Sequence, residues 1–473
     1  MFDTVIIGAG VTGTAVAYYL SSYKLNMLIV DKEEDICSGT SKANSAIIHA
    51  GHDAKSGSLK ARFNVEGSRM IKELSRKLGF SYRNNGALVL CFSKEDMPKL
   101  EELYQRGLNN GVEALEIIDG EKAREMEPNL SKEVYAALYC PTSAIVCPFE
   151  LTQALCENAC RNGLKYRFSY RAEKIEKKDG YYLINDEIKT RSIINCAGVY
   201  ADEIHNQVCD LKYHIVPKKG DYVLLDKNMG SYVNMTLFTL PTEKGKGVLV
   251  TPTVHGNLLV GPTSTVIDDK EGNNTTSEEL KYVMDTALKT CPELSYRQVI
   301  TSFSGIRAHE EGGDFVIQES EDGFFDVLGI ESPGLSASVA IARYISELFE
   351  KKYQFPVNDE YKEDLKPMVK VNSLSIDERN RLIKENPAYG HIVCRCEEIS
   401  EGEIIDAMHR VPPAVSLDGI KRRTRAQMGR CQGGFCTPKI MEIMKREMKI
   451  NIKDIHKNNG ASYIDEGPLE DFR

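Results

Sequence analysis

Three features are missing from this sequence: an excess of basic residues, a long apolar run and a secretion signal. Its 60 Lys and Arg residues are outnumbered by 69 Asp and Glu residues, a net charge of −9, so we expect no nucleic-acid partner. No run of about 18 apolar residues occurs, so we expect no membrane span. The chain begins Met-Phe-Asp without a basic segment or cleavage site, and we therefore expect a cytoplasmic protein.

The chain has 473 residues, which is enough for two to four domains. It contains 13 cysteines, which fall into two groups. In a cytoplasmic protein these cysteines are not expected to form a disulfide framework. The first nine are scattered and mostly lie in apolar contexts, so we expect small buried side chains. Among them Cys156 and Cys160 share a helix face but have no further ligand nearby. The last four differ in kind, because they lie within 43 residues.

The first 31 residues have the pattern of a dinucleotide site. An apolar run over residues 4–7 leads into Gly8, Gly10 and Gly13, then a helical stretch and a second apolar run that ends at Asp31. Gly8 permits a sharp turn, Gly10 lets the backbone approach a pyrophosphate, and Gly13 lets the helix pack on the sheet. The helix N-terminus offers N–H groups to phosphates, and Asp31 can accept a hydrogen bond from a ribose. The motif alone does not distinguish FAD from NAD.

Three later segments have the composition of further contacts to the same cofactor. Residues 37–52, CSGTSKANSAIIHAGH, offer hydroxyl and amide groups around a short apolar run. Residues 192–202, SIINCAGVYAD, predict a buried strand that ends in small residues before a helix. Residues 323–338, GFFDVLGIESPGLSAS, predict a strand, a turn and a helix N-terminus that aims N–H groups at a ligand.

The rest of the sequence contains patterns typical of a sheet, of helices and of a linker. Period-two alternation over residues 214–265 predicts an antiparallel sheet. The charged stretch 353–390 has few periodic apolar positions and predicts a linker that wraps the surface. Helical periodicity marks the segments at about 58–78, 94–111, 148–162, 277–290 and 334–351.

Four motifs together resemble the D-amino-acid oxidase superfamily of FAD-dependent oxidoreductases: the glycine motif, NCAG at 195–198, SGIRA at 304–308 and GIESPGLSAS at 329–338. The resemblance covers about residues 1–365. It implies an α/β fold with a Rossmann-like FAD-binding domain, and an antiparallel-sheet substrate domain that roofs the flavin. A small helical C-terminal domain follows.

The resemblance implies the following domain boundaries and FAD contacts. The FAD-binding domain comprises 1–80, 146–212 and 300–365, and the substrate domain comprises 81–145 and 213–299. A linker (366–390), a [2Fe–2S] domain (391–450) and a tail (451–473) complete the chain. The residues expected at FAD are Gly8, Gly10, Val11, Thr12, Gly13, Asp31, Lys32, Ser41, Asn44, Ser45, Ala172, Ala197, Gly198, Gly305, Gly334, Leu335 and Ser336.

Residues 391–438 resemble the bacterioferritin-associated-ferredoxin-like [2Fe–2S] domain. They contain Cys394-Arg-Cys396 and, after 34 residues, Cys431-Gln-Gly-Gly-Phe-Cys436. Four thiolates in two pairs can hold the cluster, tuned by glycine N–H groups. Structural zinc is the alternative, and buried free cysteines are a third interpretation. The basic run 421–425 is expected on a helix leading to the cluster, where it offsets cluster charge, docks an electron partner or faces solvent.

Two kinds of enzyme within the superfamily resemble different parts of this sequence. The segments NSAIIHAGHDAKSGSLKARFNVEGSRM and KGDYVLLD look like L-2-hydroxyglutarate oxidases and dehydrogenases. The cluster domain instead resembles that of the FAD subunit of anaerobic glycerol-3-phosphate dehydrogenase. This second resemblance leads, and it implies oxidation of sn-glycerol 3-phosphate to dihydroxyacetone phosphate, with electrons leaving through the cluster to a separate redox subunit. A third interpretation is an electron-transfer or redox-sensing subunit without an organic substrate.

The implied substrate is a small anionic secondary alcohol, which needs a base and an anion site. Histidine is the preferred base near neutral pH. His49 and His52 lie in the segment that resembles the flavin-edge loop, and His255 lies in the roofing sheet. Arg307, in SGIRA, matches the arginine that binds the substrate anion in this superfamily, with a surface salt bridge as the alternative. Tyr222 is expected where the roofing sheet meets the substrate.

Overall fold

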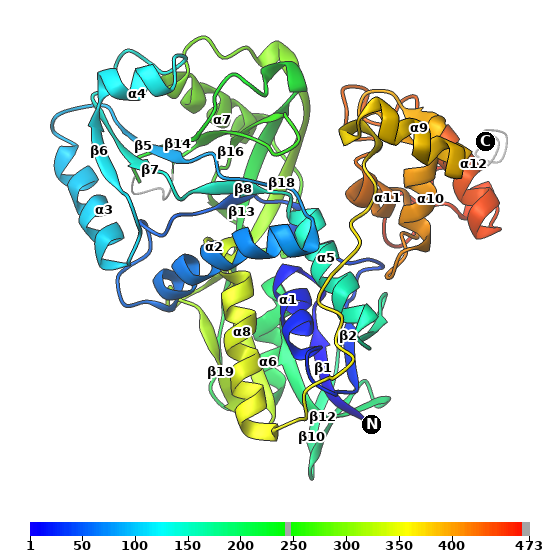
Figure 1. Cartoon of the computed structure of the whole chain (residues 1–473). Coiled ribbons are helices and arrows are strands. Elements are labelled where there is room, and N and C mark those ends of the chain that lie inside the picture. The colour runs from blue at the N-terminus through cyan, green and yellow to red at the C-terminus, as the bar shows by residue number, and fades with distance from the viewer. Residues whose placement is uncertain (242–246, 466–473) are drawn as a thin grey trace, which may run out of the picture.

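The computed structural model describes residues 1–241 and 247–465 and shows three regions (Figure 1). The lower region is a Rossmann-like domain built on an eight-stranded sheet. The strands in sheet order are β10 (Ile175–Lys178), β11 (Tyr181–Ile184), β12 (Ile188–Asn195), β1 (Phe2–Ile7), β2 (Met27–Val30) and β9 (Lys165–Arg167), with β20 (Phe324–Leu328) beside β12 and β19 (Val316–Glu321) beside β20.

The centre of this sheet is parallel. β1 pairs in parallel with β2 on one side and with β12 on the other, and β12 pairs in parallel with β20. β2 is buried at every position, because helices cover the sheet as they do in other parallel sheets. One hydrophobic core joins the sheet to four helices, α1 (Val11–Leu20), α2 (Leu59–Leu78), α5 (Pro148–Arg161) and α8 (Gly334–Tyr353), while α6 (Ala201–Val208) packs in other clusters.

The upper region is a roofing domain on a nine-stranded sheet. Its strands in order are β17 (Thr265–Val266), β13 (Ile215–Leu225), β16 (Leu258–Gly261), β15 (Leu249–Pro252), β14 (Thr236–Thr239), β5 (Ala87–Cys91), β7 (Ala136–Cys140) and β6 (Glu116–Asp119), with β18 (Val299–Glu310) also on β13. Three helices flank it, α3 (Met97–Asn109), α4 (Gly120–Met126) and α7 (Ser277–Thr290).

The roofing sheet differs from the predicted antiparallel sheet at one junction. β14 and β5 pair in parallel, whereas the other paired strands of the sheet run antiparallel. This junction is where the two separate stretches of chain that build the sheet meet. A small sheet, β3 (Ile47–Ile48), β8 (Ala144–Val146) and β4 (Tyr82–Arg83), completes the strands of these two domains.

One predicted domain boundary is wrong. The sequence places residues 300–365 in the FAD-binding domain, but β18 pairs with β13 from Ile215↔Glu310 to Leu225↔Val299. Residues 300–310 therefore extend the roofing sheet. The reason is that hydrogen bonding to β13 determines where this strand belongs, and its sequence indicates only that it is a strand.

The third region, beside the other two in Figure 1, is the C-terminal domain. It has its own hydrophobic core. Its elements are β21 (Ile392–Cys394), β22 (Ile399–Ser400), α10 (Glu401–His409), α11 (Leu417–Thr424) and α12 (Thr437–Met448).

The predicted linker contains a helix that the sequence analysis missed. An extended segment leaves α8 and rises to the C-terminal domain (Figure 1), and α9 (Ile376–Glu385) follows it. A capping box stabilises α9, since the Ser375 and Glu378 side chains each bond the other residue's backbone N–H. The helix has no buried residue, which explains why apolar periodicity did not reveal it.

Across residues 1–241 and 247–465, we find no helix with the length and apolar character needed to span a membrane.

Candidate functional site

A cavity of about 1020 Å³ lies between the Rossmann-like sheet and the roofing sheet. Residues directly after β1, β2 and β12 line it, namely Gly8, Asp31 and Cys196. Parallel α/β sheets bind ligands at this edge, where the carboxyl ends of neighbouring strands meet.

Most of the residues predicted at a dinucleotide come together in this cavity. Two do not line it, Gly13 and Ser336, which lie behind its wall. Those that line it are Gly8, Gly10, Val11, Thr12, Asp31, Lys32, Ser41, Asn44, Ser45, Ala172, Ala197, Gly198, Gly305, Gly334 and Leu335.

The glycine turn permits two close backbone approaches. Gly8 has φ +106°, and a Cβ there would lie 2.3 Å from the carbonyl oxygen of Cys196. A Cβ on Gly13 would lie 1.9 Å from the carbonyl oxygen of Gly8. Any side chain at either position would therefore push β1, α1 and β12 apart. The turn thus brings the N-terminus of α1 to the cavity, where its N–H groups favour an anion.

Asp31 is held in place by the same turn. Its Oδ2 accepts a hydrogen bond of 2.6 Å from the N–H of Ala9, and its Oδ1 accepts one of 2.9 Å from the N–H of Glu33. Burial nevertheless raises the pKa of this carboxyl to about 6, against the effect of these two N–H groups. Asp31 is therefore fixed as an acceptor at the cavity wall, as a ribose hydroxyl requires.

The loop from residue 37 to 46 folds over the N-terminus of α1. Ser41 Oγ accepts a bond of 2.9 Å from the N–H of Val11, and Asn44 Oδ1 accepts one of 2.8 Å from the N–H of Ala46. These side chains shape the loop as well as line the cavity. A Cβ on Gly305 would lie only 1.9 Å from the carbonyl oxygen of Ala43, so β18 packs directly on this loop.

The wall of the cavity formed by the roofing sheet carries an aromatic group. The hydroxyl of Tyr222 lies 3.1 Å from Ser45 Oγ. The Tyr222 ring stacks on Phe303, with ring centroids 4.9 Å apart. Tyr222 therefore joins the roofing domain to the Rossmann-like domain across the cavity.

The three histidines considered as bases lie in three different environments. His49 lines the cavity, with its ring centroid 5.7 Å from that of Phe238. His52 does not line it: this residue is buried, and its Nδ1 lies 3.4 Å from Cys140 Sγ. His255 lies apart from the cavity beside Glu150, at 3.3 Å. Of the three, only His49 is positioned to act in the cavity.

Arg307 lines the cavity from β18. Its Nη2 donates to the carbonyl oxygen of Thr263 at 3.1 Å, and its Nη1 donates to Ser264 Oγ at 3.3 Å. No described carboxylate forms an ion pair with it, so the alternative of a surface salt bridge has no support in the described part of the chain.

Lys218 is a cavity residue that the sequence analysis missed. It lies directly opposite Arg307 in the β13–β18 pair and also lines the cavity. Opposed residues of an antiparallel pair project from the same face. The sequence could have revealed this residue. Lys218 and Tyr222 are an even number of residues apart in the alternating pattern, so their side chains are expected on the same face of the strand. Two cations on one wall form a site for an anionic group.

The four C-terminal cysteines form two sulfur pairs. Cys396 Sγ and Cys431 Sγ lie 3.8 Å apart, and the thiols of Cys394 and Cys436 are hydrogen-bonded. Each pair joins one cysteine of the first motif to one of the second. No three of these sulfurs, all within the described residues, lie within 4.8 Å of one another.

This arrangement suits two metal ions better than one. A single tetrahedral zinc with Zn–S bonds of about 2.3 Å needs all four sulfurs about 3.8 Å apart. A [2Fe–2S] unit needs two sulfurs on each iron, which the two pairs supply. The Cys436 thiol and the N–H groups of Gln427 and Glu397 lower the pKa of Cys394 to about 6, and this favours the thiolate ligand.

The basic run 421–425 has a different role from those considered from the sequence. Arg422 and Arg423 are buried, and they donate to Asp35 Oδ2 at 2.9 and 2.6 Å. Both neighbouring arginines therefore bind the Rossmann-like domain of the same chain, and neither a solvent-facing surface nor a docking site for a partner fits them. The sequence could not reveal this, since Asp35 lies nearly 400 residues away.

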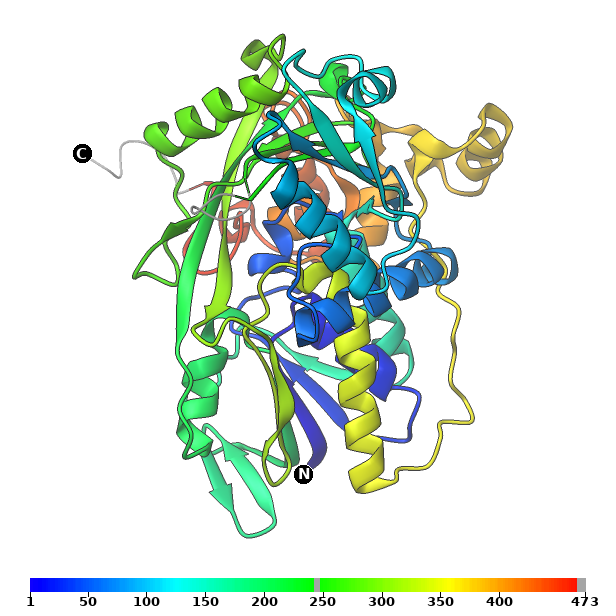
Figure 2. The same cartoon turned by 90° about the vertical axis from the view of Figure 1, so that its left-hand side faces the viewer.

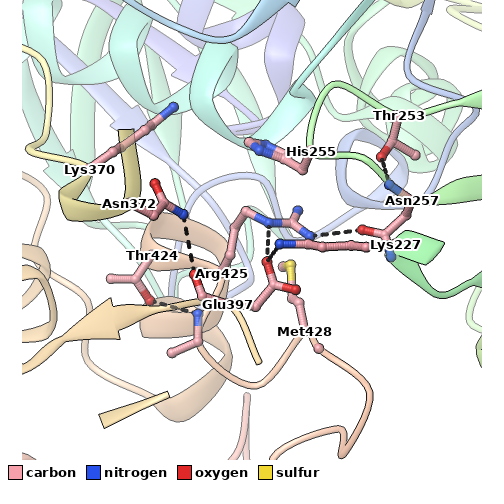
Figure 3. A network of polar contacts seen from close by, with 12 residues as sticks. Lys227, Thr253, His255, Asn257, Lys370, Asn372, Glu397, Thr424, Arg425 and Met428 are labelled. Atoms are coloured by element: carbon pink, nitrogen blue, oxygen red, sulfur yellow. Dashed lines mark hydrogen bonds and ion pairs between the residues drawn. The ribbon is translucent and has the colours of Figure 1, made fainter. Parts of the chain in front are cut away.

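A second polar network joins the C-terminal domain to the roofing domain (Figure 3). Glu397, next to Cys396, is buried and accepts from Lys227 and Arg425, each at 3.0 Å. Arg425 also donates to Asn257 Oδ1 at 3.3 Å, and Asn257 donates to the carbonyl oxygen of Leu225, the last residue of β13. The cysteine loop is thus held against the end of the strand that carries Tyr222.

Two family models match the chain, and known proteins resemble it. A family model described as FAD dependent oxidoreductase (DAO) matches residues 3–348, and one described as BFD-like [2Fe-2S] binding domain matches residues 392–446. The chain is 46% identical to a glycerol 3-phosphate dehydrogenase of Caloramator mitchellensis, with 99% of each chain covered. It is 29% identical to the mitochondrial L-2-hydroxyglutarate dehydrogenase of Mus musculus, over 74% of this chain and 88% of that one.

A solved structure is similar as well. It is the dithionite-reduced L-alpha-glycerophosphate oxidase of Mycoplasma pneumoniae with FAD bound, with a TM-score of 0.74 and 30% identity. The match covers 78% of this chain and 99% of that one. With the cavity and the cysteine pairs, these matches identify both cofactors as FAD and a [2Fe–2S] cluster. The chain therefore belongs to the FAD dependent oxidoreductase family and carries a BFD-like [2Fe–2S] domain at its C-terminal end.

Proposed function

We propose that this protein is a dehydrogenase that oxidises sn-glycerol 3-phosphate to dihydroxyacetone phosphate. The observation that carries the proposal is the 46% identity to a glycerol 3-phosphate dehydrogenase over 99% of both chains. That match includes the cysteine domain, which most of the other resemblances to the Rossmann-like and roofing domains leave uncovered.

The cavity supports a small substrate with an anionic end. Arg307 and Lys218 lie opposite each other on the roofing sheet. A guanidinium offers a rigid fork of N–H donors to phosphate oxygens, and an ammonium adds a second positive charge. The carbonyl oxygen of Thr263 and the hydroxyl of Ser264 fix the guanidinium in place. We assign these two cations to the phosphate.

The other end of the substrate carries the hydroxyl to be oxidised. When bound, FAD would accept a hydride and the cluster would transfer single electrons. His49 lines the cavity and takes the hydroxyl proton on its imidazole. Its backbone N–H donates to Ser336 Oγ at 2.8 Å, which positions the residue at the N-terminus of α8. Tyr222 orients the substrate from the roof.

We also propose that electrons leave to a separate redox subunit, in the cytoplasm. Cys396 is exposed, and Phe435, between the last two cysteines, is 84% exposed. An exposed aromatic side chain at the edge of a redox centre suits a partner surface. The cytoplasm is favoured because all 13 cysteines are free thiols, as expected where thiols stay reduced.

Anaerobic addition of glycerol 3-phosphate to the purified holoenzyme tests the substrate. The flavin absorbance is expected to bleach at once, and L-2-hydroxyglutarate is expected to leave it unchanged. Bleaching by L-2-hydroxyglutarate alone would replace the proposed substrate. No bleaching by either compound would favour a subunit that only transfers electrons.

L-2-Hydroxyglutarate is the second candidate substrate, for a specific reason. The chain is 29% identical to an L-2-hydroxyglutarate dehydrogenase over 74% of its length, and two cations can also bind a carboxylate. We rank L-2-hydroxyglutarate second, because the match to its dehydrogenase leaves about a quarter of this chain uncovered.

A further inference from the structure

The described residues beyond the [2Fe–2S] family match, 447–465, include a closed loop. The 3₁₀ helix Ile452–Asp454 is followed by a loop from His456 to Tyr463, whose ends pair as an isolated β-bridge. Inside it, Ser462 accepts from the N–H of Lys457 at 2.8 Å and from the N–H of Asn458 at 2.9 Å. From the sequence this stretch is expected to be a tail, but its own hydrogen bonds give it a fixed shape.

The loop is attached to the cluster domain through α11. The carbonyl oxygen of His456 accepts from the N–H of Leu417 at 3.2 Å, and that of Lys457 accepts from the N–H of Asp418 at 2.9 Å. The same helix carries the two arginines that bind Asp35. The loop therefore moves with the part of the cluster domain that docks on the Rossmann-like domain.

The loop also binds the Rossmann-like domain itself, next to Asp35. Asn459 Oδ1 accepts from the N–H of Glu34 at 2.8 Å, and His456 Nε2 forms a short contact with Glu34 Oε2. Glu34 is three residues beyond Asp31, the acid at the end of β2. The loop is thus fixed beside the ribose end of the cofactor cavity.

Two asparagines of this loop reach the cavity. Asn458 and Asn459 both line it. Asn458 Oδ1 is buried and has no hydrogen-bond partner in the described part of the protein. A buried acceptor without a donor is costly. Because this oxygen is not exposed to the cavity that Asn458 lines, the side-chain amide must turn to meet a donor of the ligand.

We propose that Asn458 is an FAD-binding residue, and that loop 456–463 closes the cavity over the adenosine end of FAD. The amide oxygen of Asn458 accepts from a ribose hydroxyl or from the adenine amino group, and its NH₂ can donate to neighbouring oxygens. The domain that holds the cluster thereby retains the flavin as well. FAD leaves only after this loop has separated from Glu34. The proposal depends on FAD as cofactor and is independent of the substrate.

The direct test is the release of FAD from the full-length holoenzyme. Asn458→Ala is expected to raise the dissociation rate and the Kd of FAD about tenfold, as for the loss of one buried hydrogen bond. The iron content and the cluster absorbance should stay at the wild-type level. Lys457→Ala is the matched control, because this neighbouring residue is exposed, and it should release FAD as the wild type does. FAD release from Asn458→Ala within twofold of the wild type would overturn the proposal.

A second measurement needs no substitution. Hydrogen exchange of the backbone amides of residues 456–463 is compared between the FAD-loaded and flavin-stripped wild-type protein. Bound FAD is expected to slow exchange in this loop, while α9, which lies outside the cavity lining, exchanges equally in both forms. Equal exchange of the loop with and without FAD would also overturn the proposal.

Discussion

The two cofactor sites of this protein are built in opposite ways. The FAD cavity is assembled from segments spread from Ile7 to Asn459, and backbone turns and close approaches shape much of it. The cluster site consists of four thiols from two short loops. An added methyl group can therefore destroy the first site, whereas a change of ligand atom destroys the second.

The two sites nevertheless share one support. The segment from Asp31 to Asp35 carries the cavity-lining carboxylate of Asp31 at one end and binds Arg422 and Arg423 of the cluster domain at the other. The Glu397 network adds a second attachment, at the end of β13 (Figure 3). Since buried charges fix the cluster domain to both other domains, we expect the cluster to stay in one position during turnover.

The largest expected effect comes from removing one cluster ligand. Cys431→Ser should lose the visible absorbance of the cluster and essentially all electron delivery to an external protein acceptor, because one iron loses a thiolate. FAD content should be unchanged. Absorbance and iron analysis check this, with Cys160→Ser as control, since Cys160 is a partly exposed thiol outside the site. Zinc in place of iron in the purified wild type would contradict the cluster assignment.

A substitution in the glycine turn should have the opposite effect, since it should spare the cluster and weaken the binding of the flavin. Gly8→Ala places a Cβ 2.3 Å from a backbone oxygen at φ +106°, so we expect FAD affinity to fall on the order of 100-fold. Gly163→Ala is the matched control, because Gly163 has φ +101° but no atom within 4 Å of its Cβ position. Flavin titration separates the two, and an FAD affinity of Gly8→Ala equal to that of Gly163→Ala would contradict the role of the close contact at Gly8.

A smaller effect is expected at the anion site. Arg307→Ala should raise KM for glycerol 3-phosphate roughly 10- to 100-fold, which corresponds to the loss of one charge-assisted hydrogen-bonding group. Arg297→Ala, an exposed arginine before β18, should leave KM unchanged. Steady-state kinetics measure both values. A KM within twofold of wild type for Arg307→Ala would remove this residue from the substrate site.

The smallest effect concerns the stability of the flavin-free protein. Burial raises the pKa of Asp31 from 3.8 to about 6. The folded state therefore holds this proton more tightly than the unfolded state, and its stability falls as pH rises from about 4 to about 6. Asp31→Asn should remove this fall, which is on the order of 1–2 kcal/mol, and should bind FAD more weakly. Denaturant unfolding at pH 5 and 7 measures it, with the exposed Asp268→Asn as control.

The sequence predicts the glycine turn and the acid that follows β2, because both belong to one local unit. Gly8, Gly10, Gly13 and Asp31 belong to one strand–helix–strand unit, so spacing alone places them together. The four cysteines are recognisable for the same reason.

Features that depend on distant partners were not predictable. The strand character of β18 is readable, but its pairing with β13 is a tertiary property. The basic run predicts a charge-offsetting, partner-docking or solvent-facing surface, because nothing near it in sequence shows that Asp35 neutralises Arg422 and Arg423. His52 resembles His49 in sequence position, yet its ring faces Cys140 and not the cavity.

The central claim is that electrons enter at the FAD cavity from glycerol 3-phosphate and leave through the cluster. Rapid anaerobic mixing of the holoenzyme with glycerol 3-phosphate, followed by flavin absorbance and by the electron paramagnetic resonance signal of the reduced cluster, tests it directly. We predict flavin bleaching followed by the cluster signal in the wild type, and bleaching alone in Cys431→Ser. A cluster that stays oxidised while the flavin is reduced, with equal delivery to the acceptor by both proteins, would contradict the account.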